Sequence, residues 1–369
     1  MSISNKNYLQ GLNSLRFFAA FLVIISHGQL SLIKLNINKG HLFPIFTRGG
    51  DGVEFFFVLS GFLITYLLSK EVNKTGTISI REFYLRRVFR IWPLYFLIII
   101  IGLIVLCGLF PTLFHKPYFN FPIWKWLVLY ILFLPNLAAS LYPMGLLHPL
   151  WSIGVEEQFY LFWAPIVKLF KNKMLLAILI FILLSSIWQI LLEIKIFQFE
   201  ERLNGFFVFQ KFYAMSIGSF FGYALFHWKK RIQKSFICNK YFQYLLLFAV
   251  LIHLFYFVPY ANFFLYKFLL AIIFGLIIFN TVSVENTIFK MEKQPLIYLG
   301  TISYGLYMYH MIVDYVLRII FSKFSNVQNP ILFSIIYFLL LILMTIIIAG
   351  FSFKYFEKYF LKIKDKHTL

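Results

Sequence analysis

Long apolar segments dominate this sequence and leave few folds open to it. Eleven mostly apolar windows follow one another, and each is long enough, or nearly so, to cross the ~30 Å hydrocarbon core of a bilayer as a helix. The windows are residues 12–32, 53–69, 93–113, 124–140, 152–170, 174–193, 206–227, 241–259, 263–282, 297–320 and 331–353. Hydrophobic residues make up 61% of the 369 positions. We therefore expect an all-α, polytopic integral membrane protein whose main partner is the lipid bilayer.

Positive charge is concentrated between the windows. The formal net charge is +20, and its basic residues gather in 70–92, in 229–240 and in the tail after 353. Cytoplasmic loops of membrane proteins carry such an excess of Lys and Arg, so we place all three segments in the cytoplasm. The same distribution argues against a nucleic-acid partner.

The charge pattern also limits the number of crossings. Five windows separate the first two basic segments, whereas an even number must cross if both segments face the cytoplasm. We expect 124–140, which contains Leu134-Pro135, to be re-entrant or interfacial among the helices. The result is about ten transmembrane helices plus one such segment. We expect a multi-pass protein of the cell inner (plasma) membrane with both termini cytoplasmic.

We expect a single transmembrane domain, 1–369, without an appended soluble domain. No linker-like tract interrupts it, and the first window has no small-residue cleavage site, so we interpret that window as a retained helix. Cys107 and Cys238 are the only cysteines. They provide neither a disulfide framework nor a cysteine metal site, and we expect no metal.

Two ionisable residues in the first window share a helix face. Arg16 and His27 are eleven residues apart, which is 20° more than three full turns and ~16 Å along the axis. Ionisable side chains inside a membrane are costly and are usually functional. The alternatives are an arginine that extends to the interface and a histidine satisfied in the core.

A basic motif, FYLRRVFRIWPLY, precedes the third window. Arg86 and Arg90 are at i, i+4 and project from one side of a helix, whereas Arg87 turns away and suits lipid headgroups. Guanidinium groups capture phosphates in a planar, bidentate way, so a polyphosphorylated cytosolic donor would fit here. The alternative is a simple positive-inside signal.

The segment LHPLWSIGVEEQFYLFWAP carries a polar face inside an apolar window. Ser152, Glu156 and Tyr160 fall at i, i+4 and i+8 and share that face. A buried carboxylate needs a polar cavity or a cationic partner, so we favour a functional role for Glu156. Glu157 points elsewhere and is equally compatible with the wet outer interface.

A second polar stripe runs along the segment GTISYGLYMYH. Ser303, Tyr307 and His310 form it, and His310 is a second candidate for proton handling, although a satisfied core histidine is the alternative. His253 has no polar companions in its own segment, so we expect it in the core. Ser60-Gly61 suits close approach of helices.

Taken together and in this order, these motifs resemble acyltransferase family 3, a family of integral-membrane O-acyltransferases. The resemblance covers nearly the whole chain. It rests on Arg16-x10-His27 and on four further fragments, namely GVEFFFVLSGF, FYLRRVFRIWPLY, HPLWSIGVEEQFY and SYGLYMYH. The chain departs from the family in carrying Glu54 where Asp is usual and Tyr359 where a proline is common.

The resemblance implies transfer of an acyl group, commonly acetyl, from cytosolic acetyl-CoA to a hydroxyl of an extracytoplasmic cell-surface polysaccharide or lipid-linked sugar. On that basis His27 is the general base and Glu156 orients or charge-stabilises it. Arg16, Arg86 and Arg90 are assigned to the donor's phosphates. The residues assigned to the acceptor or a developing oxyanion are Trp151, Ser152, Tyr160 and His310.

Other functions remain open at this stage. The acceptor can instead be an antibiotic precursor, a glycolipid or a peptidoglycan sugar. A proton-coupled transporter or flippase would use Arg16, His27 and His310 as a relay, but such proteins usually contain inverted repeats, and the sequence shows no convincing repeat. The acyl length, a covalent intermediate and the oligomeric state are left open by the sequence.

Overall fold

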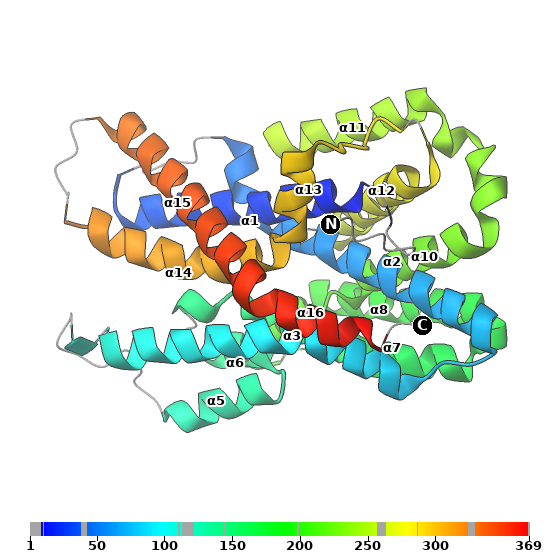
Figure 1. Ribbon diagram of the computed structural model, residues 1–369, viewed down its shortest axis with the longest axis horizontal. Coiled ribbons are helices and arrows are strands. Elements are labelled where there is room, and N and C mark those ends of the chain that lie inside the picture. The colour runs from blue at the N-terminus through cyan, green and yellow to red at the C-terminus, as the bar shows by residue number, and fades with distance from the viewer. Residues whose placement is uncertain are drawn as a thin grey trace.

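The fold is a bundle of helices with no strand among the residues that the structure describes (Figure 1). A computed structural model describes residues 9, 11–37, 43–109, 111–112, 122–142, 145–197, 199–256, 263–285, 287–323 and 329–367. Its α-helices are α1 (Leu12–Lys34), α2 (Gly49–Thr75), α3 (Ile80–Leu103), α5 (Ile123–Ile131), α6 (Pro135–Leu141), α7 (Leu150–Leu169), α8 (Met174–Glu193), α9 (Glu201–Phe209), α10 (Phe212–Gln233), α11 (Lys240–Phe255), α12 (Phe264–Ser283), α13 (Gln294–Thr301), α14 (Ser303–Phe321), α15 (Pro330–Ser352) and α16 (Lys358–Asp365). Short 3-10 helices are η1 (Pro44–Thr47), η3 (Gly145–Leu147), η4 (Lys171–Lys173) and η5 (Phe236–Cys238), and π-helical turns are η2 (Ile104–Leu109) and η6 (Phe353–Glu357).

Six of the described helical segments are long and apolar enough to cross a membrane, and they contain α1, α2, α3, α8, α12 and α15. A seventh crossing is possible if α13 and α14, which meet at an angle of 69°, form one broken span. The polytopic all-α class is thus confirmed, with fewer unambiguous spans than the ten expected. Three further spans were expected. The helices α7 and α10 have 20 and 22 residues but carry polar side chains inside or at their ends, and α11 has only 16 residues.

The window 124–140 does not form one helix. It is split into α5, of 9 residues, and α6, of 7 residues, neither long enough to cross ~30 Å at 1.5 Å per residue. Phe133 lies between them with φ of 56°. Gln158 of α7 holds this break, because its Nε2 donates to the Phe133 carbonyl at 3.0 Å and to Asn136 Oδ1 at 2.9 Å. The expected re-entrant or interfacial segment is thus two short helices, each below the length of a membrane span.

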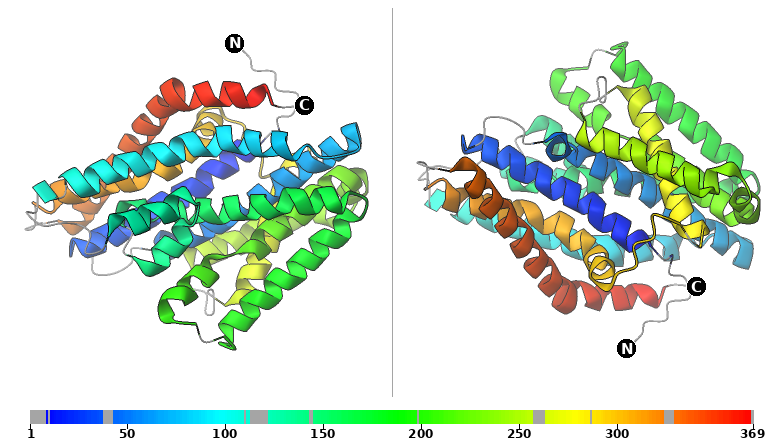
Figure 2. Two further views of the ribbon diagram at one scale, coloured as in Figure 1. Left: turned by 90° about the horizontal axis from the view of Figure 1, so that it is seen from below. Right: turned by 90° about the horizontal axis from the view of Figure 1, so that it is seen from above.

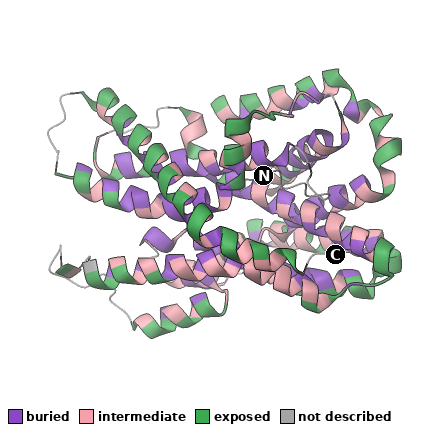
Figure 3. Cartoon of the chain, viewed as in Figure 1, coloured by how far each residue is buried: buried purple, intermediate pink, exposed green. Residues whose placement is uncertain are grey.

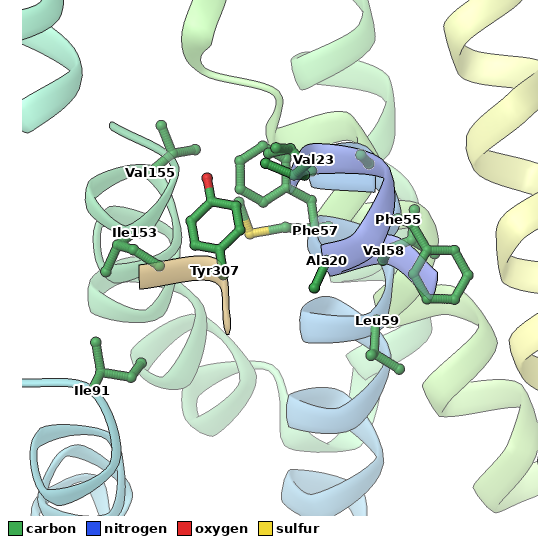
Figure 4. Packing of buried hydrophobic residues seen from close by; sticks show 14 of the residues in the cluster. Ala20, Val23, Phe55, Phe57, Val58, Leu59, Ile91, Ile153, Val155 and Tyr307 are labelled. Carbon is green, nitrogen blue, oxygen red and sulfur yellow. The ribbon is translucent and has the colours of Figure 1, made fainter. Parts of the chain in front are cut away.

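Glycine brings α2 and α10 into backbone contact at the centre of the bundle. A Cβ added to Gly61 would lie 1.8 Å from the Met215 carbonyl oxygen, and one added to Gly218 would lie 1.9 Å from the Val58 carbonyl oxygen. Small residues of this kind let membrane helices pack closely. Figure 4 shows the apolar core beside this contact, with buried side chains of α1, α2 and α7 near Tyr307 of α14.

The other half of the bundle is held by a polar contact among three helices. Ser31 of α1 donates to Asp314 Oδ2 of α14 at 2.6 Å, and Tyr337 of α15 donates to Asp314 Oδ1 at 2.8 Å. From there α15 crosses the bundle obliquely and α16 continues along α3 (Figure 2). Exposed residues run along α15 (Figure 3). Many exposed residues of α8 and α15 are large and apolar, as expected of surfaces that face lipid.

Candidate active site

Three histidines from distant parts of the chain meet inside the bundle. His27 of α1 lies with its ring centroid 5.0 Å from that of His310 of α14 and 6.5 Å from that of His148, two residues before α7. His310 is fully buried, whereas His27 and His148 are half-buried. Among the described residues, no group of three His, Cys, Asp or Glu side chains is placed to hold a metal ion.

The partners of these rings determine where each neutral ring carries its proton. His310 Nδ1 lies 2.6 Å from the Tyr307 carbonyl oxygen, which can only accept, so this nitrogen is a donor. His310 Nε2 is then an acceptor for His27 Nδ1, 3.1 Å away. His27 Nδ1 also lies 3.1 Å from the Val23 carbonyl oxygen, a second partner that can only accept. The remaining lone pair of His27 is thus on Nε2, as a general base requires.

Arg16 is at the opposite end of the same helix. Its Nη1 donates to Asn13 Oδ1 at 2.8 Å, and Asn13 Nδ2 donates to Thr301 Oγ1 at 3.1 Å, at the bend between α13 and α14. Its side chain is half-buried. Eleven residues of helix separate it from His27 by ~16 Å, so the two residues share a face but act at different depths.

Ser152 and Tyr307 join the start of α7 to α14. Their hydroxyl oxygens are 2.7 Å apart, and both hydroxyls lie within 3.1 Å of the Pro149 carbonyl oxygen. The Tyr307 ring centroid lies 5.8 Å from that of His310, so the Ser152–Tyr307 pair is adjacent to the histidines. Trp151 points to another surface of α7, where it stacks on Phe209 at 4.6 Å and is 91% buried. The structure therefore brings Ser152, but not Trp151, next to the histidines.

Glu156 belongs to a different contact group from the one expected. Its Oε2 accepts from Tyr160 Oη at 3.1 Å, and Tyr160 in turn shares a short hydrogen bond with Ser60 of α2. The hydrogen-bond partners that the structure gives His27 are the Val23 carbonyl and His310. Among the described residues no hydrogen bond joins Glu156 to His27, so the role of Glu156 in orienting or charge-stabilising His27 stays a prediction.

The arginines of α3 also differ in their surroundings. Arg86 forms an ion pair with Glu71 at 2.8 Å, which neutralises it, whereas Arg90 is exposed. Arg87, which we had assigned to headgroups, lies with its guanidinium carbon 5.7 Å from the centroid of the Tyr160 ring. The structure thus brings Arg87, rather than Arg86, next to Tyr160 and its Glu156 partner.

A buried polar cluster at the start of α2 escaped the sequence analysis. His253 is buried in the core, as expected, but it has polar companions from other helices. Its Nε2 lies 2.7 Å from Asp51 Oδ2, and its Nδ1 lies 2.7 Å from Tyr266 Oη. Lys267 also pairs with Asp51. The sequence signal for this cluster was that Asp51 and Lys267 are charged residues in or beside apolar windows. The contacts of Asp51 with His253 and Lys267 join α2, α11 and α12, which are distant in sequence.

Glu54, one turn further along α2, is fully buried. It accepts from Tyr213 Oη at 2.9 Å and lies 3.6 Å from Lys211 Nζ. The hydroxyl of Tyr213 and the ammonium group of Lys211 thus offset part of the cost of burying this carboxylate. Glu54 therefore links α2 to the start of α10.

Comparison with known proteins identifies the family of this chain. A family model described as an acyltransferase domain matches residues 9–350. A peptidoglycan O-acetyltransferase of Listeria monocytogenes is 27% identical over 98% of this chain and 59% of its own length. A putative O-acetyltransferase of Staphylococcus aureus is 28% identical over 96% of this chain and 58% of its own length, and a putative peptidoglycan O-acetyltransferase of Bacillus subtilis is 27% identical over 95% and 54%.

The chain spans somewhat more than half the length of these relatives. No solved structure matches it. The family match covers the helices that carry Arg16, His27, Ser152, Glu156 and His310, so the histidine cluster and its surroundings lie within the matched region. The chain belongs to the acyltransferase family that this model describes.

Proposed function

We propose that this protein is a membrane O-acetyltransferase that moves an acetyl group from cytosolic acetyl-CoA to a sugar hydroxyl on the other side of the membrane. The observation that supports this most is the orientation of His27, whose Nδ1 is held by two acceptors so that Nε2 is left to take a proton. Two relatives carry names that include peptidoglycan O-acetylation, so a peptidoglycan sugar is the first acceptor to test, followed by other extracytoplasmic glycans or lipid-linked sugars.

The transfer step follows from this orientation. His27 Nε2 removes the proton of the acceptor hydroxyl as its oxygen attacks the thioester carbonyl. The new ester C–O bond forms, the C–S bond breaks, and the sulfur leaves with the proton from the imidazolium. His310 and the Val23 carbonyl stabilise the imidazolium by accepting from Nδ1–H.

Neighbouring residues bind the two substrates in this proposal. Arg16 lies ~16 Å from His27 on the same helix, which is comparable to an extended pantetheine arm of ~15–20 Å, and it suits a donor phosphate. Arg87 and Arg90 extend the positive surface near Tyr160. The Ser152 and Tyr307 hydroxyls, 2.7 Å apart, both donate to the Pro149 carbonyl oxygen, so their remaining lone pairs can accept from a hydroxyl of the acceptor sugar.

Radiolabel transfer tests this function. Proteoliposomes that contain the protein receive [14C]acetyl-CoA on the side of Arg90 and a peptidoglycan precursor on the other side. We expect labelled sugar from the wild type and a loss of at least ~100-fold in His27→Ala, because general-base catalysis contributes 10²–10⁴-fold. His227→Ala is the matched control, since that histidine is exposed on α10.

The proposal fails if His27→Ala labels the sugar at the wild-type rate, or if the wild type consumes no acetyl-CoA with any extracytoplasmic glycan. A proton-coupled transporter would move solute in the same vesicles without producing a labelled ester.

A further inference from the structure

The helices α1 and α14 continue side by side beyond the histidine cluster, towards the end of the bundle that the basic segments predict to be extracytoplasmic (Figure 1). His27 and His310 form one contact between them. Four residues further on each helix, Ser31 donates to Asp314 Oδ2 at 2.6 Å. Because four residues are about one helical turn, the two helices advance together by about a turn from one contact to the next.

The following turn carries a cation on each helix. Lys34 follows Ser31 by three residues on α1, and Arg318 follows Asp314 by four residues on α14. Lys34 is exposed, whereas Arg318 is half-buried, with its guanidinium carbon 5.3 Å from the centroid of the Tyr315 ring. Both cations interact electrostatically with Asp314, so the two positive charges lie near the same carboxylate.

Lys34 is also placed on the histidine face of α1. Seven residues separate it from His27, which is 20° short of two full turns and ~10 Å along the axis. Its ammonium group interacts electrostatically with the rings of His27 and His148. A group bound at Lys34 is therefore separated from His27 by a distance that a disaccharide can bridge.

The acidic residues near this pair do not balance its charge. Asp314 is one carboxylate beside two cations, and its oxygens already accept from Ser31 and Tyr337. Asp51 of α2 is paired with Lys267. The elements η1, η3 and α15 contact α1 or α14, and the sequence has no Asp or Glu around η1, around η3 or at the start of α15, in residues 33–50, 132–150 and 315–333. A positive charge is therefore left at this end of α1 and α14.

Cations at an extracytoplasmic end run against the usual distribution, because Lys and Arg are retained mainly on the cytoplasmic side. An ammonium group offers three hydrogen-bond donors, and a guanidinium group presents a planar fork of donors. Together they match the oxygens of a phosphate or a carboxylate. The placement of Lys34 and Arg318 beside the histidines therefore suits an acidic group of the substrate that arrives from this side.

We propose that Lys34 and Arg318 bind an acidic group, a phosphate or a carboxylate, of the acceptor glycan and thereby position its hydroxyl at His27. The inference rests on the proposed function, since it names the charge of the acceptor that this function requires. It makes negatively charged glycans and glycan precursors better acceptors than neutral glycans of the same length.

The test uses one acceptor in three forms. The first is the disaccharide of N-acetylglucosamine and N-acetylmuramic acid with its free carboxylate. In the second form the carboxylate is reduced to an alcohol, and in the third form the reduced disaccharide is carried on a lipid diphosphate. Each form is given in proteoliposomes to the wild type, Lys34→Gln, Lys34→Arg and Lys323→Gln. Lys323→Gln is the matched control, because Lys323 is exposed just beyond the end of α14 and carries the same charge.

We expect Lys34→Gln to raise KM for a charged acceptor about tenfold, the effect of losing one charge-assisted hydrogen bond, with kcat and KM for acetyl-CoA unchanged. Lys34→Arg should retain most of the affinity, and Lys323→Gln should match the wild type. The neutral disaccharide should not distinguish the variants. An effect on the first form identifies a carboxylate and an effect on the third form identifies a phosphate, and either result supports the inference.

A second measurement separates binding from turnover. Binding of the charged acceptors to His27→Ala protein, measured by titration calorimetry, should weaken about tenfold when Lys34→Gln is added and should not change when Lys323→Gln is added. Equal KM and equal affinity for the two lysine variants with both charged acceptors would overturn the inference, while acetyl transfer by the wild type upheld the proposed function.

Two further outcomes are decisive. A loss that is equally large with the neutral disaccharide, or that follows the anionic lipid content of the vesicles, would assign the two cations to lipid headgroups and would also overturn the inference. Absence of transfer by the wild type to any extracytoplasmic glycan would overturn the proposed function itself.

Discussion

His27 and His310 illustrate how much depends on single atoms at the residue scale. A histidine in a membrane helix can be a base only if its free nitrogen carries a lone pair, and here two acceptors on Nδ1 produce that state. If His27 is the general base we propose, the arrangement is similar to a catalytic triad in which a neutral imidazole replaces the carboxylate behind the base. Holding the base without a charged partner suits a low-dielectric site, where an unpaired carboxylate would be costly to bury.

Substituting His310 tests this role. We expect His310→Leu to lower kcat on the order of 100-fold, because His27 loses the partner that stabilises its protonated form, with little change in KM for acetyl-CoA. His310→Gln should recover part of the rate, since its amide oxygen can accept from His27 Nδ1. The pH–rate profiles of both variants report the change in His27 directly. A wild-type kcat and profile in His310→Leu would show that the contact has no catalytic consequence.

At the scale of helices, the candidate active site depends on the close packing of α2 against α10. Ser60, which contacts Tyr160, is adjacent to Gly61, whose Cα lies against the backbone of α10. The same two helices carry Glu54 and Lys211, so a shift between them would displace both polar groups.

A methyl group at this contact should therefore destabilise the protein. Gly218→Ala places its Cβ 1.9 Å from the Val58 carbonyl oxygen, so the backbones must separate. We expect a loss of about 2–3 kcal/mol in the free energy of unfolding, in the range of overpacking in other proteins, and a lower Tm in detergent. Gly50→Ala, also in α2, has no atom within 4 Å of its added Cβ and should keep the wild-type Tm. Equal Tm values for both variants would contradict the packing argument.

The basic segments predict the orientation of the whole molecule in the membrane, and this prediction can be measured. In a Cys107→Ser, Cys238→Ser background, we expect a single cysteine at exposed Thr47 to react with a membrane-impermeant maleimide in intact cells. A single cysteine at exposed Lys366 should react only after permeabilisation, because Lys- and Arg-rich segments stay in the cytoplasm. Labelling of the Lys366 position in intact cells would reverse the orientation and the direction of transfer with it.

Local periodicity and charge were enough to predict part of this molecule from its sequence. The all-α membrane class and the shared face of Arg16 and His27 depend on residues close together in the chain, where helix geometry alone sets the spacing. For the same reason the Ser152, Glu156 and Tyr160 stripe is found on one face of α7, although its partners were not foreseen.

Contacts between helices far apart in sequence were decided only by the tertiary structure. His310 rather than Glu156 meets His27, Glu71 neutralises Arg86, and Asp51 pairs with His253. Each contact depends on how two helices are rotated and staggered against each other, which steric packing of small residues such as Gly61 determines and hydrophobic periodicity does not. The sequence by itself therefore determined which residues are polar within the membrane, and the packing of the helices decided which of them meet.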